Sequence, residues 1–309
     1  MGSADIVPGV SGGTIALILG IYPRLVTAIS RFDAHLLGLL ARREWRAAAV
    51  HVDLRFLVTL ALGILTGIVA LASLMLYLLT HQRQYTLAVF FGLIMASSLI
   101  VARMVQPRTR AQLGGTCLLA LVAGVFAFWL VGLEQVGLRD HLGYYFLCGM
   151  VAICAMILPG ISGAYILWLM GAYETVAGII HNLAHWEITA RELLTLVVFA
   201  SGCAIGLISF SKLLRWLLAQ AYMATLAVLG GFMVGSLRLM WPFQTDLTPQ
   251  IEKLNSKQYQ SFVPEQWDSG VTACVALAVT AMAAVLLLER WGSLAQPTDE
   301  GAQLGKEKV

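Results

Sequence analysis

Residues 6–14 read Ile-Val-Pro-Gly-Val-Ser-Gly-Gly-Thr, and residues 157–165 read Ile-Leu-Pro-Gly-Ile-Ser-Gly-Ala-Tyr. The match extends without a gap over residues 5–29 and 156–180, with nine of 25 aligned positions identical. Proline removes a backbone donor and glycine relaxes the backbone, so Pro-Gly-x-Ser-Gly inside an apolar segment predicts an interrupted helix. Interrupted helices at corresponding places in two halves of a chain are typical of transport sites.

The composition is that of a membrane protein. Hydrophobic residues make up 59% of the 309 residues and charged residues 12%, whereas soluble domains contain about 45–50% apolar residues. The net charge of +3 is too small to indicate a nucleic-acid partner. The five cysteines lie in apolar segments without a Cys-x-x-Cys pair, which indicates core residues. The sequence indicates no metal site, no cofactor and no ATP-binding loop.

We predict an all-α polytopic membrane protein built from two inverted repeats. The motif segments, 1–30 and 143–180, are interpreted as re-entrant hairpins, because the second has too many apolar residues around its break for one span. Residues 1–134 would form the first repeat, 143–291 the second and 292–309 a cytoplasmic tail. Apolar segments long enough to cross the bilayer core, about 20 residues, lie at 54–80, 85–103, 114–132, 193–216, 220–240 and 269–289.

Basic residues predict the orientation. If each motif segment enters and leaves on one face, thirteen Lys and Arg residues fall on one side of the membrane and six on the other. The richer side is predicted to be cytoplasmic, with loops near 31–53, 104–113 and 212–219 and the C-terminus. A hairpin plus three spans is an odd number of crossings, so the second half is inserted upside down. The two tips would then meet near the bilayer midplane, as in alternating-access transporters; a duplication that serves only stability is the alternative.

The two breaks are predicted to bind an anion. A helix that starts after Pro-Gly-x-Ser-Gly directs unpaired N–H groups and its positive dipole end at the break. Small residues admit a ligand to the backbone, and hydroxyls can donate to phosphate oxygens. Taken singly, each Ser or Thr is also explained as a helix cap. The candidate substrate-binding residues are Pro8, Gly9, Ser11, Gly12, Gly13, Thr14, Arg24, Pro159, Gly160, Ser162 and Gly163.

Few ionisable residues are predicted at membrane depth, where they are costly and often functional. Arg24 follows the first tip and is a candidate to hold an anionic head group. Glu174 follows the second tip and is a candidate to carry a coupling proton, as is Asp5 before the first tip. The alternative places Arg24 and Glu174 at membrane ends, with their side chains extended to water.

The repeated strings resemble a known family, the bacterial polyprenyl-phosphate transporters. Residues 4–22 resemble its N-terminal signature almost residue for residue, and Leu158 to Gly163 with Gly171-x-Tyr173 resembles its second. The resemblance implies a transporter, not an enzyme, that returns undecaprenyl phosphate from the outer to the inner leaflet of the bacterial cytoplasmic membrane. The lipid is reused in cell-wall and surface-polymer synthesis. The coupling ion, a proton or another, and the oligomeric state, a homo-oligomer among the options, are left open.

Two features depart from the family pattern. Pro23 stands where an acidic residue often follows Gly-Ile-Tyr, which leaves the role of that acid open in the first half. Seven residues precede Pro8, so the first motif lacks the apolar arm that residues 144–157 give the second. We expect either an upstream start or a truncation.

Two other functions fit parts of the pattern. Membrane-embedded polyprenyl-pyrophosphate phosphatases also combine inverted repeats with Pro-Gly-x-Ser, but an arginine follows their serine. Gly12 and Gly163 occupy that position here, which disfavours phosphoryl transfer. A transporter of a small soluble anion would use the same helix N-termini, and only side openings for a lipid tail would distinguish it.

Overall fold

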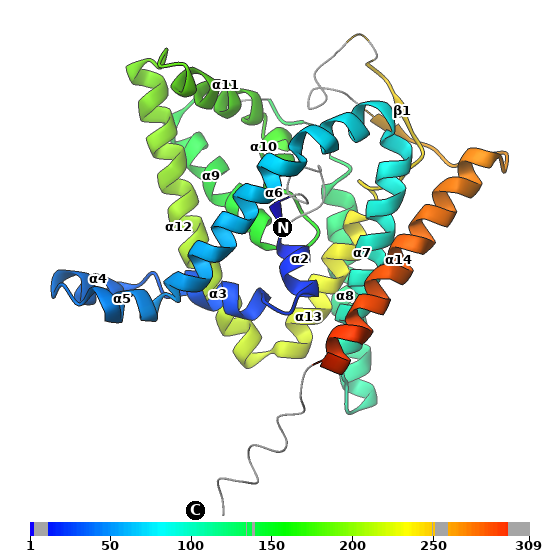
Figure 1. Cartoon of the computed structure of the whole chain (residues 1–309), viewed down its shortest axis with the longest axis horizontal. Helices are drawn as coiled ribbons and strands as arrows, with labels where there is room; N and C mark the ends of the chain where they lie inside the picture. The colour runs from blue at the N-terminus through cyan, green and yellow to red at the C-terminus, as the bar shows by residue number, and fades with distance from the viewer. Residues whose placement is uncertain (3–11, 134, 138–139, 249, 251–258, 296–309) are drawn as a thin grey trace, which may run out of the picture.

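The computed structural model describes residues 1–309 apart from 3–11, 134, 138–139, 249, 251–258 and 296–309. Nearly all of the described chain is helical, and the long helices form one bundle in which α6 runs diagonally across α12 (Figure 1). In the first half the helices are α2 Gly12–Ile18, α3 Tyr22–Ser30, α4 Ala34–Ala41, α5 Trp45–His51, α6 Leu54–His81, α7 Arg83–Met104 and α8 Arg110–Leu130. In the second half they are α9 Leu142–Ile157, α10 Gly163–Leu169, α11 Tyr173–Ala184, α12 Ala190–Gln220, α13 Tyr222–Ser236 and α14 Ser269–Ala295.

Five of the described helices, α6, α7, α8, α12 and α14, are long and apolar enough to cross a membrane. A sixth candidate is the pair α10 and α11, which is bent by 114° at a short break. The prediction of an all-α polytopic membrane protein is confirmed. The remaining apolar helices, α9 and α13, are shorter than a usual span.

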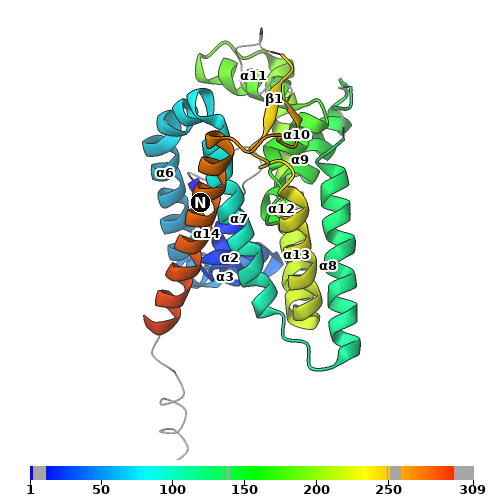
Figure 2. The same cartoon turned by 90° about the vertical axis from the view of Figure 1, so that its right-hand side faces the viewer.

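The centre of the bundle is α13, which packs against α8 on one side and α7 on the other, as Figure 2 shows for α8. Small residues permit this approach. A Cβ atom added to Gly231 would lie 2.3 Å from the carbonyl oxygen of Ala120, and one added to Gly235 would lie 2.2 Å from that of Gly124. Close backbone contact through small residues is the usual way that helices associate in membranes.

Two further stretches, one in each half, share a sequence and stand near the start of a helix. Residues 86–89 and 225–228 both read Thr-Leu-Ala-Val, and each stretch opens a core helix after a sharp end of the preceding one. The hydroxyls of Thr86 and Thr225 donate to the carbonyl oxygens four residues earlier, at 2.8 and 2.9 Å. α7 packs on α14 as α13 packs on α8. These likenesses fit two related halves, whose inverted insertion stays a prediction.

Several predicted loops are helical in the structure. Within 31–53, residues 34–41 and 45–51 form α4 and α5, and the predicted loop near 212–219 is wrong because α12 continues to Gln220. A helix satisfies its own backbone hydrogen bonds, so it can extend beyond the 20 residues that cross the hydrocarbon. The loop near 104–113 shortens to 105–109, since α8 begins at Arg110.

The polar stretch after α13 contains a two-stranded antiparallel sheet, β1 Gln244–Asp246 and β2 Tyr259–Ser261. The sheet lies at the end of the bundle away from α4 and α5 (Figure 1). Arg83, the first residue of α7, lies with its guanidinium 3.5 Å from the centre of the Tyr259 ring. The small sheet is therefore attached to the end of α7.

Candidate functional site

The two motif copies touch each other inside the bundle. The backbone N–H of Gly160 donates a hydrogen bond of 3.1 Å to the hydroxyl of Thr14. The hydroxyl of Tyr22 donates to the carbonyl oxygen of Ile157, also at 3.1 Å. Thr14 and Tyr22 are each 1% exposed. The described end of the first motif thus lies against the break of the second.

The second break folds as its sequence dictates. α9 ends at Ile157, and Pro159 has no N–H with which to continue it. Gly160 follows with φ +94°, and a Cβ atom there would lie 2.9 Å from Cα of Met233 and from Oγ of Ser236. Only glycine fits both the backbone angle and the space beside α13.

Ser162 stands at the N-cap position of α10 but does not act as a cap. Its backbone is extended, with φ −91° and ψ +130°, and its side chain makes no hydrogen bond to the first turn. The residue is 8% exposed. The cap interpretation therefore fails for this serine, and a buried hydroxyl is left beside the break.

The first break lies mostly outside the described residues, which is where Asp5, Pro8, Gly9 and Ser11 fall. Its described part is the start of α2, where Gly12, Gly13 and Thr14 are all buried. The Thr14 hydroxyl faces the second motif, as its bond with Gly160 shows.

The two motif copies end in the same turn. Gly20, with φ +68°, and the residue after it donate back to the carbonyl oxygens of Leu17 and Ala16. The same two bonds recur 151 residues later around Gly171, whose φ is +73°. This is the Schellman arrangement that closes a helix with a left-handed glycine. α2 and α10 are thereby both limited to seven residues.

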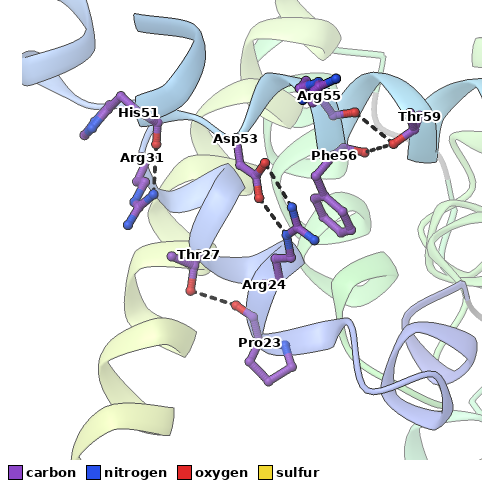
Figure 3. A network of polar contacts seen from close by, with 9 residues as sticks. All are labelled: Pro23, Arg24, Thr27, Arg31, His51, Asp53, Arg55, Phe56 and Thr59. Atoms are coloured by element: carbon purple, nitrogen blue, oxygen red, sulfur yellow. Dashed lines mark hydrogen bonds and ion pairs between the residues drawn. The ribbon is translucent and has the colours of Figure 1, made fainter. Parts of the chain in front are cut away.

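Arg24 lies on α3, and its contacts lead to the start of α6 (Figure 3). Its Nε and Nη2 donate to the two carboxylate oxygens of Asp53 at 2.6 and 3.1 Å, and its guanidinium lies 4.5 Å from the centre of the Phe56 ring. The hydrogen bonds from Arg24 hold the pKa of Asp53 below its ordinary value. The Arg24 side chain is 59% exposed, so the structure does not bring it to the junction of Thr14 and Gly160.

Glu174 lies at the opposite end of the bundle, in the first turn of α11. It is exposed and borders a pocket of about 340 Å³ between α11 and α12. Within that pocket Arg191 pairs with Asp140 at 2.8 Å. Glu174 is therefore on a polar surface and not at the break.

Comparison with known proteins identifies the family. A family model described as undecaprenyl phosphate translocase-like matches residues 1–258. The chain belongs to that family. It is 36% identical to a polyprenyl-phosphate transporter of Vibrio cholerae serotype O1, over 94% of each chain. It is 32% identical to a polyprenyl-phosphate transporter of Staphylococcus aureus, over 78% of this chain and 83% of the relative. No solved structure matches.

Membership of the translocase-like family agrees with the prediction that the chain is not an enzyme, since both relatives are named as transporters. The packing at Gly163 also disfavours the phosphatase alternative. A Cβ atom at this position would lie 2.7 Å from the carbonyl oxygen of Ala152. The arginine that a phosphatase would place after its serine cannot be accommodated here without moving α9.

Sequence reasoning missed part of the junction in this translocase-like chain. The repeated string contains Tyr22 but does not indicate its bond to Ile157. No sequence signal marks Met233 and Ser236 of α13, which lie against Gly160. The Thr-Leu-Ala-Val match between residues 86–89 and 225–228 could have marked α7 and α13 as related core helices. It could not have shown that α13 meets the break.

Proposed function

We propose that this chain is a polyprenyl-phosphate transporter that returns undecaprenyl phosphate from the outer to the inner leaflet of the cytoplasmic membrane. The observation that carries the proposal is the hydrogen bond between Gly160 and Thr14. It joins the second break to the start of α2, next to the Ser162 hydroxyl, which makes no capping bond. The names of the two relatives support the substrate class.

A phosphate head group needs hydrogen-bond donors to leave water. In hydrocarbon each unsatisfied polar or charged group is strongly disfavoured, whereas the polyprenyl tail can stay in lipid. The first-turn N–H groups of α2 and α10 and the hydroxyl of Ser162 are donors that can replace water around the phosphate. Because both helices have only seven residues, we attribute the attraction to these individual donors more than to a helix dipole.

The Gly160 N–H has a specific role in this mechanism. It now donates to the Thr14 hydroxyl, and a phosphate oxygen could accept from both groups once they separate. Opening this junction toward one face or the other would expose the head group alternately. α2 leads from the junction toward α3, and α10 leads toward α11 at the opposite end of the molecule (Figure 1).

The remaining candidate residues would contact the head group or the coupling ion on either side of this junction. Pro8, Gly9 and Ser11 would line the first break as Pro159, Gly160 and Ser162 line the second. Arg24, on the side of α4 and α5, would meet the head group on the cytoplasmic face. Asp5 and Glu174 remain the proposed coupling groups, with Glu174 at the outer end.

The test follows the head group in proteoliposomes that contain polyprenyl phosphate, through its accessibility to an impermeant probe, while released inorganic phosphate is measured in the same sample. Head-group movement without phosphate release supports the proposal. Ser162→Ala should slow the movement, whereas Ser201→Ala, on the exposed side of α12, is the matched control and should not. Phosphate release from the pyrophosphate lipid would instead support an enzyme, and uptake of a soluble anion without lipid movement would support the other alternative.

A further inference from the structure

Two short helices stand apart from the bundle. α4 and α5 lie to one side of it, at the height of α3, and run across the direction of the long helices (Figure 1). Their facing sides form a small apolar cluster of Leu36, Ala48 and Val52. Asp33 caps α4 by accepting from the N–H of Leu36 at 3.0 Å. Residues 33–52, called here the arginine hairpin, are therefore a folded unit.

The arginine hairpin exposes large apolar side chains. Leu37, Trp45 and Val50 are 68%, 63% and 77% exposed. On the long helices such exposure is expected, because those helices lie in lipid. α6, a helix long enough to cross the membrane, begins at Leu54 directly after the hairpin, so these side chains fit the boundary between head groups and acyl chains.

The same unit carries a concentration of positive charge. Arg42, Arg43 and Arg46 are all exposed, and among the residues that the structure describes none of the three is in an ion pair. Glu44 is the acidic residue between them. Cationic groups beside exposed apolar groups are the pattern of helices that bind anionic membrane surfaces.

Arg43 stands in a left-handed conformation at the turn between α4 and α5. Arg43 has φ +57° and closes α4, with its N–H donating to Leu40 and that of Glu44 to Leu39. Glycine is the usual residue at this left-handed position, and other L-residues are strained there. The turn places the exposed Arg43 side chain between α4 and α5.

Polar contacts attach the arginine hairpin to the first motif. Arg31, at the end of α3, donates to the carbonyl oxygen of His51 at 3.1 Å, and the Arg24–Asp53 pair joins α3 to the residue after the hairpin (Figure 3). His51 also contacts Asp33 at 3.2 Å. The hairpin is thus joined to α3, the helix that contains the end of the first motif.

We infer that the arginine hairpin docks on the anionic lipid surface of the membrane. Leu37, Trp45 and Val50 would enter the boundary of the acyl chains, and the three arginines would contact lipid phosphates. The partner is the bulk anionic leaflet and not the transported lipid, so the inference stands apart from the proposed function.

Hydrogen–deuterium exchange of the full chain in lipid nanodiscs tests the inference. Exchange in the arginine hairpin should slow when phosphatidylglycerol is added to zwitterionic discs. Arg42→Gln and Arg46→Gln should each reduce the protection gained from phosphatidylglycerol about fivefold. High salt should remove most of it.

Two variants separate charge from folding. Arg43→Gly removes a charge and relieves the left-handed turn, so its loss of protection cannot come from unfolding of the hairpin. Arg110→Gln removes an exposed arginine outside the hairpin and should leave the protection unchanged. The inference is overturned if the protection does not depend on lipid charge, or if Arg110→Gln loses as much protection as the hairpin variants. It is also overturned if the protection rises with protein concentration, which would indicate contact with a second copy of the chain.

Discussion

The N–H of Gly160 donates to the hydroxyl of Thr14, 146 residues away, and so connects the second break to the start of α2. Both residues are buried, so the N–H has no access to bulk water. The Thr14 hydroxyl thus satisfies a donor that the break itself creates. The bond therefore stabilises the contact between α2 and the second break; in the proposed mechanism its groups become available to a ligand when that contact opens.

Thr14→Val should destabilise the folded protein. The Gly160 N–H would lose its acceptor in a buried place, which costs about 1–3 kcal/mol, whereas Thr14→Ser keeps the hydroxyl. Thermal unfolding of the purified protein in one detergent measures the difference. Equal midpoints for the valine variant and the wild type would show that the bond does not stabilise the fold.

Gly160→Ala should prevent correct packing of the second break. The added Cβ atom would lie 2.9 Å from Cα of Met233, which cannot move without shifting α13, and residue 160 would be held in a left-handed conformation. Gly178→Ala on α11 is the control, because a Cβ atom there meets nothing within 4 Å. It should be neutral or stabilise the helix by up to about 1 kcal/mol. Yield of folded protein by size-exclusion chromatography distinguishes the two, and similar profiles would contradict the prediction.

Ser162→Ala should reduce transport without reducing stability, because the Ser162 hydroxyl makes no capping bond. Thr189→Ala is the contrast. Thr189 forms a capping box with Glu192 at the start of α12, so its loss should destabilise the protein by about 0.5–2 kcal/mol. Unfolding midpoints and head-group movement are measured on the same preparations. If Ser162→Ala loses as much stability as Thr189→Ala, Ser162 caps α10 after all.

Much of the architecture follows from periodic or repeated features of the sequence. The predicted spans 54–80 and 85–103 agree with α6 and α7 within two residues at each end, since hydrocarbon thickness sets the length of an apolar helix. The break at Pro159 and Gly160 could also be predicted, because proline and glycine act locally on the backbone.

Tertiary pairings could not be predicted in this way. Nothing in the sequence of α3 identifies Asp53 as the partner of Arg24, since Asp53 reaches it from a left-handed backbone conformation with φ +52°. Nor does the motif identify Thr14 as the acceptor for Gly160, because that bond depends on how two distant helices pack. α4 and α5 were missed because eight and seven residues are too few to show a clear apolar period.

The Arg24–Asp53 pair should make the stability of the protein depend on pH in the acidic range. The hydrogen bonds from Arg24 lower the pKa of Asp53 in the folded protein, so the carboxylate is favoured by folding. Its contribution is present above the ordinary aspartate pKa, about 3.9, and is lost as the pH falls through the lowered value. The effect on total stability should be small, because the pair is exposed to solvent.

The titration of Asp53 itself measures this effect. In protein with ¹³C-labelled aspartate carboxyls, the Asp53 resonance, assigned by its absence in Asp53→Asn, should titrate below the ordinary range. Arg24→Gln should raise the midpoint toward about 3.9. Arg55→Gln, which removes an exposed arginine two residues from Asp53, should leave the midpoint nearly unchanged. If both variants moved the midpoint equally, general positive charge and not the bidentate pair would control Asp53.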